Sequence, residues 1–139
     1  MVTFNGDIVA CCQQHIVDGP APAHLSLGRA PATGWPEVAR AVRERAVLRA
    51  LRTVGPEVLA HDAGLPASPG GYCGSCASLS GDDRVGPVVV ALTSRPTFPV
   101  IESEITRMQL DAGAEGFARR YAIPAYAHML MLGRSPVGV

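Results

Sequence analysis

The stretch WPEVARAVRERAVLRALRTV, residues 35–54, carries the clearest structural signal in the chain. Its apolar positions recur at helical spacing, and the arginines lie mostly off that stripe. The stripe comprises Val47, Leu51, Val54 and Val58. Pro36 suits the first turn of a helix and Gly55 suits its end. The pattern predicts a central amphipathic helix over 35–54, followed by one or two turns over 56–64.

Upstream of this helix, MVTFNGDIVACC (residues 1–12) is typical of a β-hairpin. Asn5-Gly6 is a preferred two-residue turn, because both positions tolerate a positive φ. The strand 8–11 is apolar on both faces and is expected to be buried, with 1–4 as its partner. Residues 13–34 are rich in Pro and Gly and are expected to form a long connection.

Downstream of the helix, a Gly-rich loop with a Cys-x-x-Cys motif is expected over 65–83. The run VGPVVVALTS (85–94) predicts a buried strand. An amphipathic helix weakened by Gly113 and Gly116 is expected over 98–122, and a short apolar helix over 123–133. The sequence therefore predicts an α+β fold with an N-terminal hairpin, a central helix, the Cys-x-x-Cys loop, a strand and C-terminal helices.

The composition excludes several classes of protein. The 139 residues are 47% hydrophobic and 17% charged, which is not typical of a disordered chain. The formal net charge is zero and no basic stripe is present, so nucleic acid is not expected as a partner. No run is long enough to span a membrane, and no secretory signal is visible. A reducing cytoplasmic location is expected, where paired cysteines bind metal or do redox chemistry more often than they form disulfides.

The four cysteines stand in two pairs, Cys11-Cys12 and the Cys73/Cys76 motif GGYCGSC (70–76). A Cys-x-x-Cys on a Gly-rich loop lets two thiolates converge on one metal centre, with backbone N–H groups aimed at the sulfurs. The distant pair would complete the site. Because adjacent strand residues point to opposite faces, three ligands are expected more readily than four. Cys12 is then either the fourth ligand or a bystander.

The histidines supply further candidates for a fourth ligand. His15 lies three residues after Cys12, and His61 ends the helix before the Cys73 loop. Each is more often a solvated or helix-terminal residue. The cases for His24 and His128 are weaker.

Three other interpretations of the cysteines compete with a metal site. CGSC matches the local signature of a papain-type nucleophile, but no Asn follows Asn5 to orient a histidine, and too few residues follow Cys76. A thioredoxin-like redox pair would sit between a strand and a helix, whereas a loop is expected before Cys73. Finally, Cys11 and Cys12 are also compatible with small buried apolar residues.

A resemblance to a known family rests on several of these motifs together. Gly6-Asp7-Ile8-Val9-Ala10-Cys11, then Leu27-Gly28, then the helix from Trp35, then Cys73 and Cys76, resemble the SPASM/Twitch auxiliary-cluster region of radical S-adenosyl-L-methionine (SAM) enzymes. The resemblance covers residues 3 to about 80. It implies a cluster-binding domain over 1–84 and a C-terminal strand and helical extension over 85–139.

The departures from that family shape the functional expectation. A full SPASM region carries about seven cysteines, and Thr33 stands at the spacing where one of them is expected. The C-x-x-x-C-x-x-C motif that binds the SAM-cleaving cluster does not occur here. The resemblance therefore implies one cluster, most readily 4Fe-4S, on Cys11, Cys12, Cys73 and Cys76. It also implies no catalysis by this chain alone, so the chain would be a fragment or split subunit.

The resemblance implies two partners, a radical SAM core domain or subunit and a peptide substrate. The rival from another class is a structural zinc module without catalysis, whose ligands would be four cysteines or three cysteines and one histidine. Thiolate ligands suit both iron and zinc, so sequence leaves the metal open.

Overall fold

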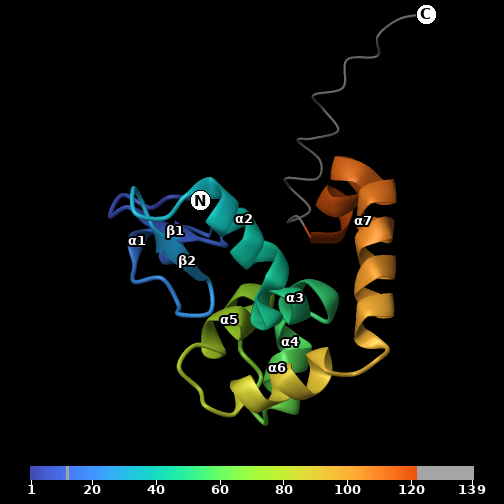
Figure 1. The fold of residues 1–139 in the computed structure, drawn as a ribbon. Helices are drawn as coiled ribbons and strands as arrows, with labels where there is room; N and C mark the ends of the chain where they lie inside the picture. Colours follow the sequence, from blue (N-terminus) through green and yellow to red (C-terminus); the bar gives the residue numbers. More distant parts are fainter. Residues whose placement is uncertain (12, 122–139) are drawn as a thin grey trace, which may run out of the picture. The chain divides into compact units, whose positions relative to one another are not determined.

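Two short strands form the β part of the structure, a computed structural model that describes residues 1–11 and 13–121 (Figure 1). Strand β1 (Asp7–Val9) pairs antiparallel with β2 (Ser26–Arg29). The register places Asp7 opposite Arg29, with an irregularity between Ile8 and Val9. The two strands anchor the residues that lead into and out of the cysteine site.

The structure has a turn where the hairpin was predicted, but its form and its main partner strand differ. Gly6 N–H bonds to Thr3 O at 3.0 Å, so Phe4 and Asn5 are the central turn residues, and Asn5 does not have a positive φ. Gly6 has a φ of 80°, as the turn requires, and residues 1–4 fold back on β1. Their pairing is limited to an isolated bridge between Val2 and Ile8 and neighbouring hydrogen bonds such as Val9 N–H to Met1 O at 2.9 Å. The partner strand β2 lies within 13–34, where the sequence predicts a long connection. The Pro and Gly residues of this segment favour a loop, whereas Leu25 and Leu27 are buried in the structure.

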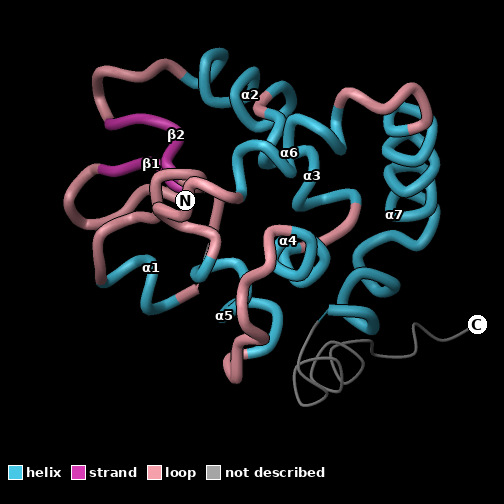
Figure 2. The backbone as a smooth tube through the Cα atoms, turned by 90° about the horizontal axis from the view of Figure 1, so that it is seen from below, coloured by secondary structure: helices cyan, strands magenta, loops and turns pink. Residues whose placement is uncertain are grey.

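Helices make up most of the described structure (Figure 2). They are α1 (Gln14–Asp18), α2 (Trp35–Glu44), α3 (Ala46–Thr53), α4 (Pro56–Asp62), α5 (Gly71–Ser78), α6 (Val85–Thr93) and α7 (Phe98–Tyr121). Together with the two strands they confirm the α+β fold class. Gly55, at a φ of 84°, separates α3 from α4 as predicted.

The predicted central helix is two helices, because the chain breaks at Arg45. Arg45 has helical φ but an extended ψ of 121°, so α3 leaves in a new direction. The guanidinium of Arg45 donates a hydrogen bond to the carbonyl of Ser26 in β2. This contact links the break between α2 and α3 to strand β2. No local sequence pattern predicts it.

The prediction of a loop around Cys73 and Cys76 is wrong, since both residues lie in α5. Gly71 and Gly74 have low helix propensity, which favours a loop. Packing against α4 overrides that preference, with Ser75 and Leu79 buried. Gly74 also lets the preceding loop approach the helix, because a β-carbon there would lie 2.3 Å from Ser68 Oγ.

The predicted strand over 85–94 is also wrong, and this segment forms α6. A short run of β-branched residues resembles a buried strand, and periodicity alone does not separate the two. In the structure Val85 and Val89, one helical turn apart, are buried in the core. Helix α6 packs against α3 and α4, so tertiary packing decides its conformation.

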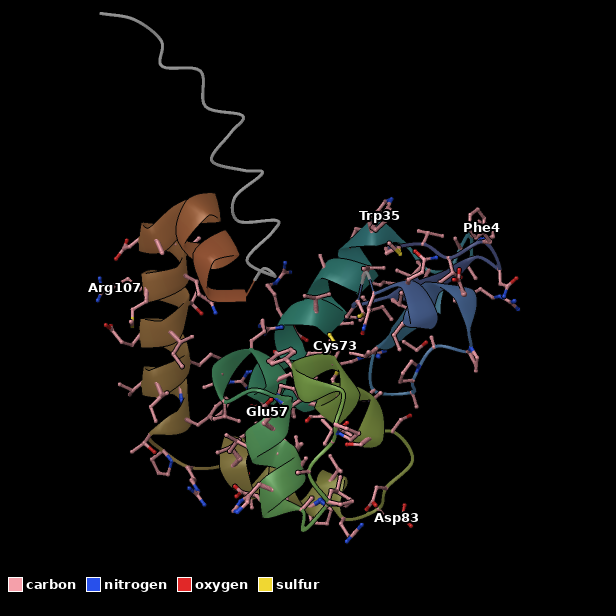
Figure 3. The ribbon with its side chains drawn as sticks, turned by 180° about the vertical axis from the view of Figure 1, so that it is seen from behind. Phe4, Trp35, Glu57, Cys73, Asp83 and Arg107 are labelled. Carbon is pink, nitrogen blue, oxygen red and sulfur yellow. The ribbon has the colours of Figure 1, made fainter. Side chains whose placement is uncertain are left out.

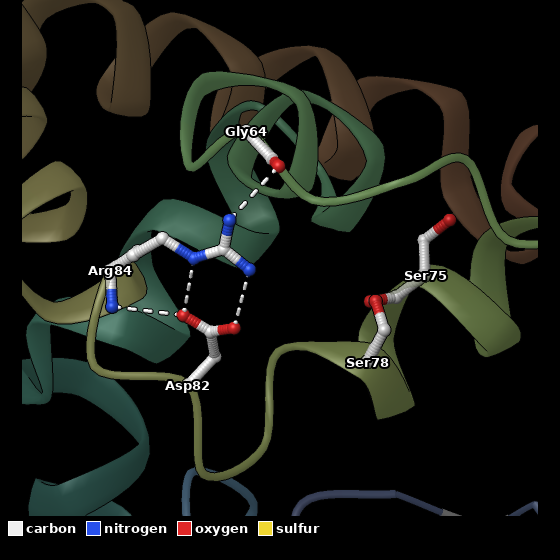
Figure 4. Close-up of polar contacts among 5 residues, drawn as sticks. All are labelled: Gly64, Ser75, Ser78, Asp82 and Arg84. Atoms are coloured by element: carbon white, nitrogen blue, oxygen red, sulfur yellow. Dashed lines mark hydrogen bonds and ion pairs between the residues drawn. The ribbon is translucent and has the colours of Figure 1, made fainter.

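An apolar core joins β1, β2 and helices α2 to α6, with Cys11 and Cys76 partly buried at its margin. Its buried members are Ile8, Leu25, Leu27, Val38, Leu48, Ala50, Leu51, Leu59, Ala60, Ala63, Leu79, Val85 and Val89. Outside the core, the Arg84 guanidinium contacts Asp82 at 2.8 Å and donates to Gly64 O at 3.1 Å (Figure 4). This contact ties the start of α6 to the end of α4.

The chain divides into two compact units, Met1–Pro99 and the part that begins at Val100. The boundary expected from the resemblance lay after residue 84, whereas α6 packs within the first unit. Helix α7 is interrupted at Gly113, where φ is 62°. The helix expected over 123–133 lies outside the described residues. Among the residues described, no helix has the length and apolar character needed to cross a bilayer.

Candidate metal centre

Cys11 is positioned by the end of β1. The backbone N–H of Ala10 bonds to Leu25 O at 2.9 Å, which holds the strand end against the segment leading into β2. Beyond it, the backbone N–H of Gln13 donates to Cys11 Sγ at 3.5 Å. The Cys11 thiol is therefore half-buried and already receives one N–H hydrogen bond.

Cys73 and Cys76 are positioned by one turn of α5. Residues three apart share a face of a helix, so both side chains lie on the same side of α5. Both are half-buried, and none of Cys11, Cys73 and Cys76 is in a disulfide. Figure 3 labels Cys73, with sulfur in yellow.

One cavity of about 270 Å³ brings the three described cysteines together. Its walls are mostly apolar and come from the end of β1, α1, the segment before β2, and helices α2, α3 and α5. The lining residues are Ala10, Cys11, Gln13, Ile16, Leu25, Val42, Leu48, Leu51, Arg52, Tyr72, Cys73, Cys76 and Ala77. Cys11 therefore lines the same cavity as the Cys-x-x-Cys motif, although more than 60 residues separate them in the chain.

The pKa of Cys76 is shifted by its burial and by the two other cysteines of the cavity. Burial raises the pKa of the Cys76 thiol to about 11, and the neighbouring Cys11 and Cys73 act in the same direction. Water is largely withdrawn from this sulfur, and a second thiolate nearby would repel its negative charge. Cys76 is therefore protonated at neutral pH unless a positive charge binds beside it.

His24 reaches the same sulfur from the segment before β2. Its Nε2 lies 3.5 Å from Cys76 Sγ, although 52 residues separate the two along the chain. Its other ring nitrogen, Nδ1, is buried and has no hydrogen-bond partner among the described residues. Burial lowers the pKa of His24, so the ring is neutral at pH 7.

A cysteine–histidine contact of this kind invites a comparison with nucleophilic catalysis. In an activated pair the thiol pKa is lowered by the imidazolium, and a third group orients the ring. Here burial moves the pKa of Cys76 up and that of His24 down, and no described group forms a hydrogen bond with Nδ1. The pair lacks the electrostatics of a catalytic nucleophile.

The other predicted ligands have different outcomes. Cys12 lies outside the described residues, as does His128, and the side chain of His15 is not described. His61 is exposed, contacts Asp62 at 3.2 Å and lines a different hollow, so it is not part of the site. The sequence makes only a weak case for His24, because nothing local marks it, whereas the structure places its ring beside Cys76.

The residue types fit a thiophilic metal in their chemistry, since three cysteines line one cavity and an imidazole lies beside one of them. Within 1–11 and 13–121, no three His, Cys, Asp or Glu side chains stand close enough together to hold one ion as they are. Ligation would require the sulfurs to move inward from the walls of the cavity. Comparison with protein-family models, curated proteins and solved structures finds no match for this chain.

Proposed function

We propose that this chain holds an iron–sulfur cluster on Cys11, Cys73 and Cys76, and that it serves as the auxiliary-cluster part of a radical SAM enzyme. The observation that carries the proposal is that Cys11, Cys73 and Cys76 all line one apolar cavity. When bound, such a cluster supplies one-electron transfer or an iron site for a substrate. Cys12 remains the candidate for a fourth protein ligand.

The size and hydrogen bonding of the cavity favour a cluster over a single ion. A cavity needs only about 10–15 Å³ to take up one water-sized group, and this one offers about 270 Å³. Two of its sulfurs are already contacted by nitrogen atoms, Cys11 by Gln13 N–H and Cys76 by His24. Hydrogen bonds to sulfur are among the features that set cluster potentials.

Zinc is the second candidate, and one distance favours it. Two ligands of a tetrahedral zinc ion, at about 2.3 Å for sulfur and 2.0–2.1 Å for nitrogen, stand roughly 3.5 Å apart. His24 Nε2 and Cys76 Sγ are 3.5 Å apart. A zinc site of three cysteines and one histidine would then be structural and closed, without catalysis.

Anaerobic purification followed by analysis of iron, acid-labile sulfide and zinc tests the proposal. We expect a brown protein with absorbance near 400 nm, and Cys73→Ala and Cys76→Ala should lose most of the iron. Cys11→Ala should lose more iron than Cys12→Ala, because Cys11 occupies the spacing after Gly6 that the resemblance gives to a ligand. His61→Ala is the matched control, since its exposed ring lies elsewhere, and it should keep all the iron.

Two results would decide against the cluster. Colourless protein with one zinc per chain would establish the structural zinc site instead. Full iron retention in both Cys73→Ala and Cys76→Ala would show that the cavity is not the binding site. The reconstituted chain should also yield no 5′-deoxyadenosine from SAM, because the C-x-x-x-C-x-x-C motif is missing from the sequence.

A further inference from the structure

His24 and Cys76 form a side-chain contact at the candidate centre between two segments that lie far apart in the sequence. The imidazole does not line the cavity onto which the three thiols open. It approaches Cys76 Sγ through Nε2 alone, at 3.5 Å. Its role therefore depends on whether Nε2 carries the ring proton or a lone pair.

The surroundings of Nδ1 decide between these two forms. A neutral imidazole has one N–H and one acceptor nitrogen. If Nε2 were a metal ligand, Nδ1 would carry the proton and would be a buried N–H with no acceptor among the residues that the structure describes. Metal-bound histidines almost always donate that second N–H to a carboxylate, a carbonyl or water.

The tautomer with the proton on Nε2 agrees better with the contacts of the ring. With the proton on Nε2, the ring donates to Cys76 Sγ, and Nδ1 is left as a buried acceptor. Buried N–H groups without a partner are rarer in proteins than under-used acceptors. The donor form also leaves the cavity free, in keeping with the absence of His24 from its lining.

We infer that His24 is not a metal ligand but a positioning residue that donates Nε2–H to the sulfur of Cys76. The part of this inference that concerns a cluster rests on the proposed function. A hydrogen bond to a ligating thiolate withdraws negative charge from the sulfur and favours the reduced state of the metal centre. His24 would thus raise the reduction potential without binding the metal.

The first arm of the test needs no metal. Long-range ¹H–¹⁵N correlation on the metal-free full chain labelled with ¹⁵N-histidine reports which ring nitrogen carries the proton. The His24 signals are those that disappear in His24→Gln. The Nε2–H tautomer is the expected result, and an Nδ1–H tautomer would overturn the inference.

The second arm compares reconstituted wild type with His24→Leu and His24→Gln. Leu removes the donor, and the Gln amide can restore one. All three proteins should bind equal iron, the potential of His24→Leu should shift downward, and His24→Gln should recover part of that shift. His61→Leu is the control and should leave the potential unchanged.

Several outcomes separate this inference from the proposed function. Loss of iron in both His24 variants, or strong ¹⁵N-histidine hyperfine coupling in the reduced cluster, would make His24 a ligand and overturn the inference. An unchanged potential in His24→Leu would also overturn it. Wild-type protein that carries zinc and no iron would end the cluster proposal, while the tautomer measurement would still decide the role of His24.

Discussion

The side chain of Thr33 fills the space beside Gly28 in which any other residue would place its β-carbon. Such a carbon would lie 2.2 Å from Thr33 Oγ1 and 2.8 Å from its Cβ. Thr33 Oγ1 also accepts the backbone N–H of Arg29 at 3.1 Å, which closes the turn after β2. Thr33, at the spacing where the resembled family has a cysteine, therefore has a structural role here.

Replacing Gly28 with Ala should lower the free energy of unfolding by about 2–4 kcal/mol. Two costs combine, the collision with Thr33 and a φ of 140° that L-residues rarely adopt. Urea denaturation measures the loss. Gly81→Ala is the matched control. Gly81 also has a positive φ, of 74°, but a β-carbon there would meet no neighbouring atom within 4 Å, so the change should cost only about 1 kcal/mol. If both variants lose the same free energy of unfolding, the collision with Thr33 does not contribute.

The meeting of Cys11 with Cys73 and Cys76 was predictable only in part from sequence. The residue types and their spacing pointed to three side chains that line one cavity. The reason they meet was not visible, since it depends on α5 being a helix packed on α4 and on β2 holding the end of β1. Long-range packing, which no local pattern records, positions the cysteines.

The two wrong predictions of secondary structure share a physical cause. Val88, Val89 and Val90 have a high strand propensity, and Gly71 and Gly74 a low helix propensity. Local preference therefore pointed away from helix in both segments. Each forms a helix because that conformation buries residues such as Val89 and Leu79 in the core. Sequence reasoning was reliable where propensity and burial agree, as in α2 and α4.

Acid should weaken the contact between Asp82 and Arg84. Hydrogen bonds from the Arg84 side chain and backbone lower the pKa of Asp82 to about 2, from 3.8. A carboxyl whose folded pKa is depressed stabilises the fold above its unfolded pKa, and that contribution is lost as pH falls. The free energy of unfolding should therefore decline between about pH 4 and pH 2.

Denaturation by urea across that pH range checks this expectation. Asp82→Asn should remove the part of the decline that comes from this contact and should loosen the link from Arg84 to Gly64. Asp83→Asn changes the exposed neighbour and should keep the decline of the wild type. If Asp82→Asn and wild type fall in parallel, the contact does not respond to acid as argued.

Phe98 should be the most sensitive aromatic position among the described residues. Its ring is 2% exposed, and the guanidinium of Arg49 lies 5.2 Å from its centroid. Phe98→Ala should cost about 3–5 kcal/mol, because it leaves a cavity and removes the cation–π contact. Phe4 is 96% exposed, so Phe4→Ala should change stability by less than about 0.5 kcal/mol. Similar losses in the two variants, by urea denaturation, would contradict the burial of Phe98.

Cys76 should react slowly with alkylating agents in the metal-free protein. The thiolate is the reactive form, and burial raises the pKa of Cys76 from 9.0 to about 11. At pH 8 the thiolate fraction should therefore be about a hundredfold below that of an unperturbed thiol. Because the folded pKa is raised, folding favours the protonated thiol, and stability falls as pH rises from about 9 toward 11.

Iodoacetamide labelling read by peptide mass spectrometry measures this rate residue by residue. The rate at Cys76 should climb with pH up to about 11, and denaturation in urea should restore rapid labelling at pH 8. Cys11→Ala should speed the reaction, because Cys11 is one of the neighbours that raise the pKa of Cys76. The acceleration should be smaller than that produced by urea, since burial is the larger cause. Rapid labelling of folded wild type at pH 8 would mean that the Cys76 sulfur is exposed to water and does not face the apolar cavity shared with Cys11 and Cys73.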